Sequence, residues 1–168
     1  MSGFLLCLVF PFLMAYAAAS DLLTMTIPNR LNGLVVAAFG LYAVGAGLGW
    51  PELAEHLGAG ALTLTVTFSL FAFGLIGGGD AKLAAATALW LGFGHLAEYL
   101  LVASLLGGIL TLAILYVRTY PLPAFTNRLP FAVHLHDAKT GIPYGIALAG
   151  AALLVLPVTQ AWARLGAI

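Results

Sequence analysis

Residues 83–117 read LAAATALWLGFGHLAEYLLVASLLGGILTLAILYV, and this apolar stretch decides the class of fold. Its single charged residue is Glu98, so most of its length is compatible with lipid. A helix rises about 1.5 Å per residue and a bilayer core is about 30 Å thick, so the stretch is too long for one span. Glycines and polar residues interrupt it between Gly92 and Glu98. We therefore predict two spans, over 83–97 and 99–117, joined by a very tight turn.

The rest of the chain is equally apolar. Of its 168 residues, 62% are hydrophobic and 7% are charged, against about 25% charged in an average soluble domain. So few polar residues cannot cover the outside of a water-soluble fold. Further apolar runs predict spans over 4–20, 31–49, 58–77 and 141–160. We expect an all-α polytopic membrane protein with about six transmembrane helices, forming a single domain over residues 1–168.

The first apolar run resembles a signal peptide, because it ends in Ala17-Ala18-Ala19-Ser20. Residues 1–6 nevertheless contain no Lys or Arg, and more hydrophobic segments follow. We expect this run to be a retained first membrane helix.

The basic residues orient the predicted spans. Six helices place the loops 21–30, 78–82 and 118–140 on one side and both termini on the other. The loop side carries most of the basic residues, namely Arg30, Lys82, Arg118, Arg128 and Lys139. The other side carries only Arg164. Because Lys and Arg are enriched in cytoplasmic loops, we predict that the three loops face the cytoplasm and that both termini are non-cytoplasmic.

Two aspartates, Asp21 and Asp80, fall at helix ends on this predicted cytoplasmic side. Each has a plain structural explanation: Asp21 as a solvated interfacial residue and Asp80 as the N-cap of the next helix. Together they have a chemical one. Two neighbouring carboxyl groups do not readily both ionise, so one of them keeps its proton. The ionised group can then accept a proton from water while the protonated group donates its proton to a carbonyl oxygen. Such a pair hydrolyses a peptide bond without a metal.

The residues around Asp80 support a special backbone arrangement. Three consecutive glycines, Gly77 to Gly79, are unfavourable in a helix but permit close backbone approach. Lys82 could pair with Asp80 and hold it ionised, which would favour a structural role. Two positions apart on a helix is a poor geometry for that pair. No Walker-type motif follows, so a phosphate-binding loop is disfavoured.

Other classes of function are excluded or disfavoured. The formal net charge is zero and the basic residues do not cluster, so no nucleic-acid partner is expected. A single cysteine, Cys7, excludes an internal disulfide and a thiolate zinc site. His134 and His136, with Asp137, are predicted to be solvated loop residues rather than metal ligands. We expect no metal and no cofactor.

Three motifs in order resemble the type IV prepilin peptidases, which are membrane aspartyl proteases. Residues 77–83, GGGDAKL, fit the Gly-x-Gly-Asp signature of that family. Asp21 followed by Ile27-Pro28-Asn29 matches its first aspartate motif, and Ile142-Pro143-Tyr144-Gly145 resembles a motif before its last helix. The resemblance covers nearly the whole chain and is closest to the short Flp/Tad-type form.

The resemblance implies a function and a site. It carries Asp21 and Asp80 over as the catalytic pair. They would remove the short basic leader of prepilin-like precursors, just before the hydrophobic helix of the pilin, at the cytoplasmic face of a prokaryotic inner membrane. The residues expected to shape the site or bind substrate are Gly77, Gly78, Gly79, Lys82, Pro28, Asn29, Pro143, Tyr144 and Gly145. Larger members have an insert with paired cysteines and methylate the new N-terminus. This chain has no such insert, so no N-methyltransferase activity is expected.

Two alternatives remain from the residues alone. A small proton- or ion-coupled transporter would use the same two aspartates as a relay, and would place them near the middle of the bilayer beside broken helices. A catalytically silent assembly subunit is the other. The sequence defines no oligomeric state.

Overall fold

The computed structural model describes residues 2–122, 129–159 and 162, and within these ranges the chain is helical and has no strands. The predicted all-α fold is confirmed for this part of the chain. The helices are α1 (Ser2–Thr24), α2 (Asn29–Ala46), α3 (Trp50–Ala72), α4 (Gly78–Arg118), α5 (Pro130–His136) and α6 (Tyr144–Val155), and a 3-10 turn η2 (Leu156–Val158) follows α6.

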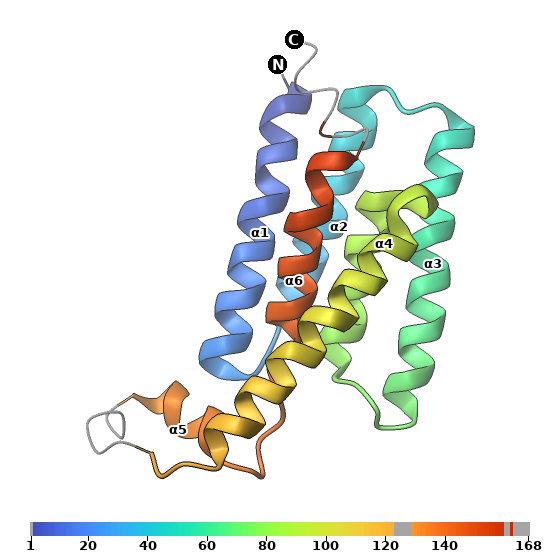
Figure 1. The fold of residues 1–168 in the computed structure, drawn as a ribbon. Helices are drawn as coiled ribbons and strands as arrows, with labels where there is room; N and C mark the ends of the chain where they lie inside the picture. The colour runs from blue at the N-terminus through green and yellow to red at the C-terminus, as the bar shows by residue number, and fades with distance from the viewer. Residues whose placement is uncertain (1, 123–128, 160–161, 163–168) are drawn as a thin grey trace.

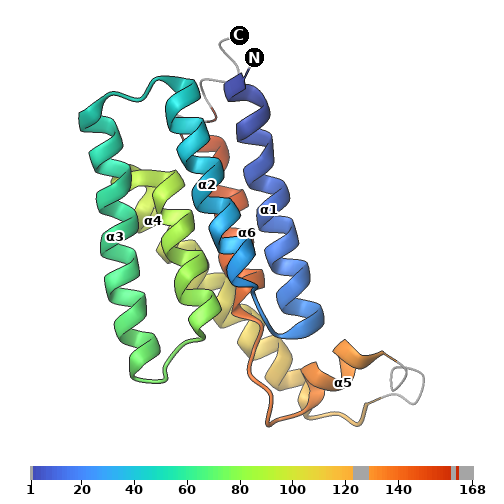
Figure 2. The same cartoon turned by 180° about the vertical axis from the view of Figure 1, so that it is seen from behind.

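The helices form an elongated bundle whose connections gather at its two ends (Figure 1). The turns α1–α2 and α3–α4 and the segment with α5 lie at one end, and the turn α2–α3 and the end of α6 lie at the other (Figures 1 and 2). The loops predicted to share one side of the membrane therefore lie at one end of the bundle. Of the basic residues used for that prediction, Arg128 and Arg164 lie outside the described residues.

Helix α4 is a helical hairpin rather than one straight rod. As a straight rod its 41 residues would extend about 60 Å, roughly twice a bilayer core. At Gly92 the backbone has φ 66° and ψ −179°, a conformation open essentially to glycine alone. The chain reverses there and returns along the bundle (Figures 1 and 2). His56 Nδ1 lies 2.8 Å from the Leu89 carbonyl oxygen next to this reversal.

The break in α4 was predicted between 97 and 99, and the structure places it at Gly92 instead. The positive φ of Gly92 is enough to reverse the chain, so no separate loop is needed. The residues that follow Gly92 are helical again. His95 and Glu98, which suggested the later break, lie one turn apart with Nδ1 and Oε2 at 3.4 Å. Glu98 is exposed, so its charge does not interrupt the helix.

The third helix also lies earlier than the predicted range 58–77. Pro51 occupies the first turn of α3 and Glu52 follows, a common combination at helix starts. Hydropathy assigned these polar residues to a loop. At the other end, α3 stops before Gly74, whose φ of 72° ends the helix.

Smaller differences affect the remaining helices. Helix α1 continues to Thr24, so Asp21 lies in its last turn rather than after it. Helix α2 covers Asn29–Ala46, where 31–49 was predicted. Helix α6 is shorter than the predicted 141–160 because it starts after Pro143 and passes into the 3-10 turn. Helix α5, seven residues long, was not predicted.

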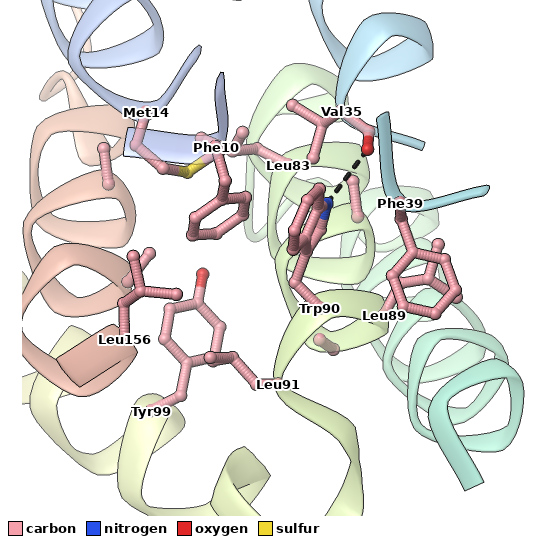
Figure 3. Packing of buried hydrophobic residues seen from close by; sticks show 14 of the residues in the cluster. Phe10, Met14, Val35, Phe39, Leu83, Leu89, Trp90, Leu91, Tyr99 and Leu156 are labelled. Atoms are coloured by element: carbon pink, nitrogen blue, oxygen red, sulfur yellow. Dashed lines mark hydrogen bonds between the residues drawn. The ribbon is translucent and has the colours of Figure 1, made fainter. Parts of the chain in front are cut away.

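Aromatic and aliphatic side chains pack together in the core of the bundle (Figure 3). Trp90 and Tyr99 of α4 are buried with Phe10 and Met14 of α1. The Trp90 indole packs on Phe10 with ring centroids 4.8 Å apart, and its Nε1–H donates to the Val35 carbonyl oxygen at 3.0 Å. These contacts hold α1, α2 and α4 together in the core of the bundle, away from the end that carries Asp21 and Asp80.

The outer surface of the bundle is apolar. Phe12, Val44 and Phe73 are 75%, 84% and 80% exposed, and many other large hydrophobic residues point outward. Within the described residues, α4 is the one helix that is long and apolar enough to cross a membrane by length and composition. Two shorter apolar helices cover Leu8–Thr24 and Tyr144–Val158. The chain has membrane character.

Candidate active site

Asp21 is buried where α1 ends and α6 begins. Its side chain is only 5% exposed, and Oδ2 accepts a hydrogen bond of 2.7 Å from the Gly145 backbone N–H. Gly145 is the second residue of α6, where backbone N–H groups have no partner within the helix. A carboxylate is favoured there because the helix dipole is positive at this end. Asp21 therefore joins the first helix to the sixth.

Asp80 lies at the start of a different helix. Gly77 is the N-cap of α4, which makes Asp80 the third residue of the helix rather than its cap. A side chain at this position reaches back to the N-cap backbone, and the Asp80 carboxylate accepts a hydrogen bond from Gly77. The predicted N-cap role of Asp80 is therefore wrong, because the N-cap is Gly77, three residues earlier. Both carboxyl groups face helix N-termini.

Each of the three glycines before Asp80 has a different neighbour. A Cβ on Gly77 would lie 2.8 Å from Asp80 Oδ2, and one on Gly78 would lie 3.1 Å from the Phe71 ring. A Cβ on Gly79 would lie 3.1 Å from Ile27 Cβ and 3.4 Å from the Ile27 carbonyl oxygen. The glycines let the first turn of α4 approach the α1–α2 turn closely, as the sequence predicted.

The α1–α2 turn is held in a fixed shape. Met25 adopts φ 53°, which is rare for a residue other than glycine. The Ser20 hydroxyl donates to the Thr26 carbonyl oxygen at 2.8 Å, and Thr24 donates to the Ser20 carbonyl oxygen at 2.7 Å. These bonds place Ile27 over the starts of both α4 and α6.

Ile27 was quoted in a motif but was not predicted as a site residue. It is 8% exposed, and its side chain lies against Gly79 and within 2.8 Å of where a Cβ on Gly145 would be. Its position between two glycines at two helix starts could not be read from the sequence. The one sequence signal that could have indicated a buried role for Ile27 is that it is an apolar residue in a turn, between Thr26 and Pro28.

Asp21 and Asp80 line one pocket of about 250 Å³, hereafter the Asp pocket. The α1–α2 turn and the three glycines complete its wall, with Met25, Thr26 and Ile27 among the lining residues. The carboxyl groups are close enough for the charge of Asp21 to act on Asp80. A carboxyl pair in a pocket of this size can bind one peptide bond and a water molecule between an acid and a base.

Lys82, Asn29 and Pro28 support the Asp pocket from outside. Lys82 Nζ donates to Asn29 Oδ1 at 2.7 Å, which ties α4 to the start of α2. Pro28 is the N-cap of α2. Lys82 therefore contacts Asn29, and the alternative in which Lys82 pairs with Asp80 is wrong. None of these three residues lines the Asp pocket.

Of the three residues before or in α6 that were predicted to shape the site, Gly145 contacts Asp21, and Pro143 and Tyr144 do not line the Asp pocket. Pro143 is buried as the N-cap of α6. The Tyr144 ring lies against Gly107, and its hydroxyl lies 3.0 Å from Thr111 Oγ1. Tyr144 lines a neighbouring cavity instead of the Asp pocket.

The histidines take no part in this site. His134 and His136 lie on the short helix α5, and Asp137 follows it, so the predicted loop is partly helical. In the portion of the chain with described positions, no group of three or more His, Cys, Asp or Glu side chains is arranged to hold a metal ion.

The family is shown by sequence comparison. Residues 8–112 match the model of the type IV leader peptidase family, and this match spans more than half of the chain. The chain belongs to the type IV leader peptidase family, which confirms the resemblance drawn from its motifs. It is therefore a protease of the leader-peptidase type, and the matched region contains both Asp21 and Asp80. No curated protein and no solved structure matches the chain.

Proposed function

We propose that the protein is an aspartyl endopeptidase that removes the leader of prepilin-like precursors, with Asp21 and Asp80 as its catalytic pair. The observation that carries the proposal is that two aspartates from distant parts of the chain line one pocket at one end of an apolar bundle. Membership in the leader peptidase family supports the class of reaction.

The reaction needs one proton on the carboxyl pair. The ionised carboxylate removes a proton from water as the water oxygen attacks the scissile carbonyl carbon. The protonated partner donates its proton to the carbonyl oxygen, giving a neutral tetrahedral intermediate. The proton taken from water then passes to the leaving nitrogen as the carbon–nitrogen bond breaks, and the carboxylate that gave up its proton recovers one from a hydroxyl group of the intermediate as the new carbonyl group forms. The pair ends with its single proton, ready for another cycle.

The proposed location is the inner membrane of a prokaryote, with the Asp pocket toward the cytoplasm. Arg30 lies in the first turn of α2, and Lys82 and Arg118 lie near the start and at the end of α4. These helix ends are at the end of the bundle that holds the pocket (Figure 1), in accord with the positive-inside rule. The chain has a single cysteine and no segment resembling the cysteine-paired insert of the larger members, so the proposed activity is hydrolysis without methyl transfer. The resemblance to the short Flp/Tad-type form makes a Flp/Tad-type pilin precursor the proposed substrate.

The transporter alternative fits the geometry less well. A relay would hold its acids near the middle of the bundle, next to interrupted helices. Both aspartates lie instead at helix ends, and the reversal at Gly92 lies toward the opposite end of the bundle (Figure 1).

The test is cleavage of a prepilin-like precursor by purified protein in detergent or liposomes. Asp21→Asn and Asp80→Asn should each lower kcat by about 10²-fold or more, since each removes a general acid or base. Asp137→Asn is the matched control, because Asp137 is an exposed loop aspartate whose carboxylate accepts from the Lys139 backbone N–H. A metal chelator should leave the rate unchanged. Normal cleavage by either site variant would contradict the proposal.

A further inference from the structure

Asp80 lies at the boundary of two different cavities. One is the Asp pocket. The other, of about 470 Å³, lies between α3, both halves of α4 and α6, and we call it the lateral cavity. Asp80 is the residue that lines both, whereas Asp21 lines the Asp pocket. A peptide bond held at Asp80 therefore has one of its two sides toward the lateral cavity.

The lateral cavity offers almost no free hydrogen-bonding groups. The Thr67 hydroxyl donates to the Ala81 carbonyl oxygen at 3.1 Å and to its own helix, and the Ser104 hydroxyl donates to the Leu100 carbonyl oxygen at 2.7 Å. The Tyr144 hydroxyl pairs with Thr111. Because burying an unpaired polar group is costly, the cavity favours an apolar occupant. Its volume lies within the roughly 300–1,000 Å³ of typical ligand pockets.

The rim of the lateral cavity is apolar and open at the side of the bundle. Leu75, after α3, is 68% exposed, and Leu100, on the second half of α4, is 40% exposed. These rim residues belong to the same apolar outer surface that gives the chain its membrane character. An apolar segment can therefore reach Asp80 from the lipid side without crossing a polar surface.

We infer that the lateral cavity binds the apolar residues that directly follow the scissile bond of the precursor. The inference rests on the proposed function, because it assigns part of the substrate to a surface next to the proposed catalytic pair. The leader lies on the other side of Asp80, at the Asp pocket. Small residues of α4, among them Ser104 and Gly108, set the size of side chain that the cavity accepts.

A rival surface exists on the other side of α3. A larger apolar cavity of about 580 Å³ lies between α2, α3 and α4, and Gly33 and Gly60 line it. Neither aspartate lines this cavity. Lys82 and Asn29, which are joined by a hydrogen bond, line its end near the Asp pocket. The lateral cavity is favoured over it because of its direct contact with Asp80.

The test fills each cavity with a leucine side chain. A Cβ added at Gly108, Gly33 or Gly40 meets no atom within 4 Å, and all three glycines lie in helices, where leucine is better tolerated than glycine. Gly108→Leu fills the lateral cavity, Gly33→Leu fills the rival cavity, and Gly40→Leu adds bulk to the outer surface of α2. The substrate is a precursor with a short basic leader followed by an apolar helix.

Gly108→Leu should raise KM about tenfold or more, since it takes the place of a buried apolar side chain of the substrate. The other two variants should behave as wild type, and all should keep the wild-type Tm. A precursor with alanines just after the cleavage site should be cut by Gly108→Leu at close to the wild-type rate. Loss of folding would not give this rescue. Gly108→Ala, with less bulk, should have an intermediate KM.

The outcomes separate the inference from the proposed function. Wild-type kinetics for Gly108→Leu together with an inactive Asp80→Asn would overturn the inference alone. An increase in KM for Gly33→Leu instead would transfer the substrate to the rival cavity and also overturn it. Cleavage by Asp80→Asn would overturn the proposed function.

Discussion

Replacing Gly145 by alanine tests how much the site depends on α6. The added Cβ would lie 2.8 Å from Asp21 Oδ2, 2.8 Å from Ile27 Cδ1 and 3.0 Å from Asp21 Cβ. Because all three contacts are far inside normal van der Waals distance, Asp21 and Ile27 must move. The Gly145 N–H bond to Asp21, 2.7 Å long, is lost or lengthened by this movement.

The size of the effect follows from this hydrogen bond. A hydrogen bond to a charged group contributes about 1.5–3 kcal/mol, which corresponds to roughly 10- to 150-fold in rate if it holds Asp21 in its reactive position. We expect Gly145→Ala to lower kcat by this factor in the precursor cleavage assay. The movement acts on Asp21 and not on the lateral cavity, so KM should change little.

Gly150→Ala is the matched control on the same helix. Its Cβ would meet Leu106 Cδ1 at 3.4 Å, an ordinary contact that a flexible side chain accommodates. A second control combines Gly145→Ala with Asp21→Asn. If the glycine acts through the aspartate, the double variant should be no slower than Asp21→Asn alone. Wild-type kcat for Gly145→Ala, or additive losses in the double variant, would refute the reasoning.

Three further predictions follow from the fold and the site. Gly92→Ala should lower the free energy of unfolding by about 1–3 kcal/mol, because its backbone conformation disfavours a side chain and a Cβ would lie 3.3 Å from the His56 ring. Gly94→Ala, with its nearest contact at 4.0 Å, is the control in the same denaturation measurement. Gly79→Ala should lower kcat while sparing Tm more than Gly92→Ala, since it moves Ile27 beside the carboxyl pair; unchanged turnover would count against the close packing there. The kcat of the wild type should fall at both low and high pH, because the reaction needs one proton on the pair, and a pH-independent rate would contradict the paired mechanism.

The helical class and the site end of the bundle could be predicted from composition, hydropathy and basic residues. These signals depend on many residues, so they tolerate local errors. The grouping of the α1–α2 turn with the α3–α4 turn needed only the number of crossings. This grouping does not depend on where α4 reverses, so the wrong position predicted for the reversal did not affect it.

The helix boundaries depended on single residues and could not be predicted as well. Gly92, Gly94, His95 and Glu98 all interrupt the apolar stretch, and the break was predicted between 97 and 99; only the backbone conformation identifies Gly92 as the point of reversal. Pro51 and Glu52 start a helix, yet their polarity made them look like a loop. Hydropathy reports burial in lipid and not hydrogen bonding, so helical turns outside the apolar stretch are missed.

For the candidate site, the importance of the residues named from the sequence stays a prediction, and the sequence did not predict what those residues contact. Gly145 was expected to shape the site, and its role became visible through a bond across the bundle. Tyr144 and Lys82 were expected beside it and contact Thr111 and Asn29 instead. Contacts between distant segments depend on helix packing, which a single sequence does not specify.

The bond between Gly145 and Asp21 also has a consequence for the biosynthesis of the protein. The two residues are 124 positions apart, so at roughly 5–20 residues per second a ribosome needs about 6–25 s to add the second after the first. During that interval Asp21 and Asp80 can both be in the membrane while the partner of Asp21 has not been made. Under the proposed function, the nascent chain should cut precursors inserted nearby only slowly, and full activity should begin after α6 has left the ribosome and docked.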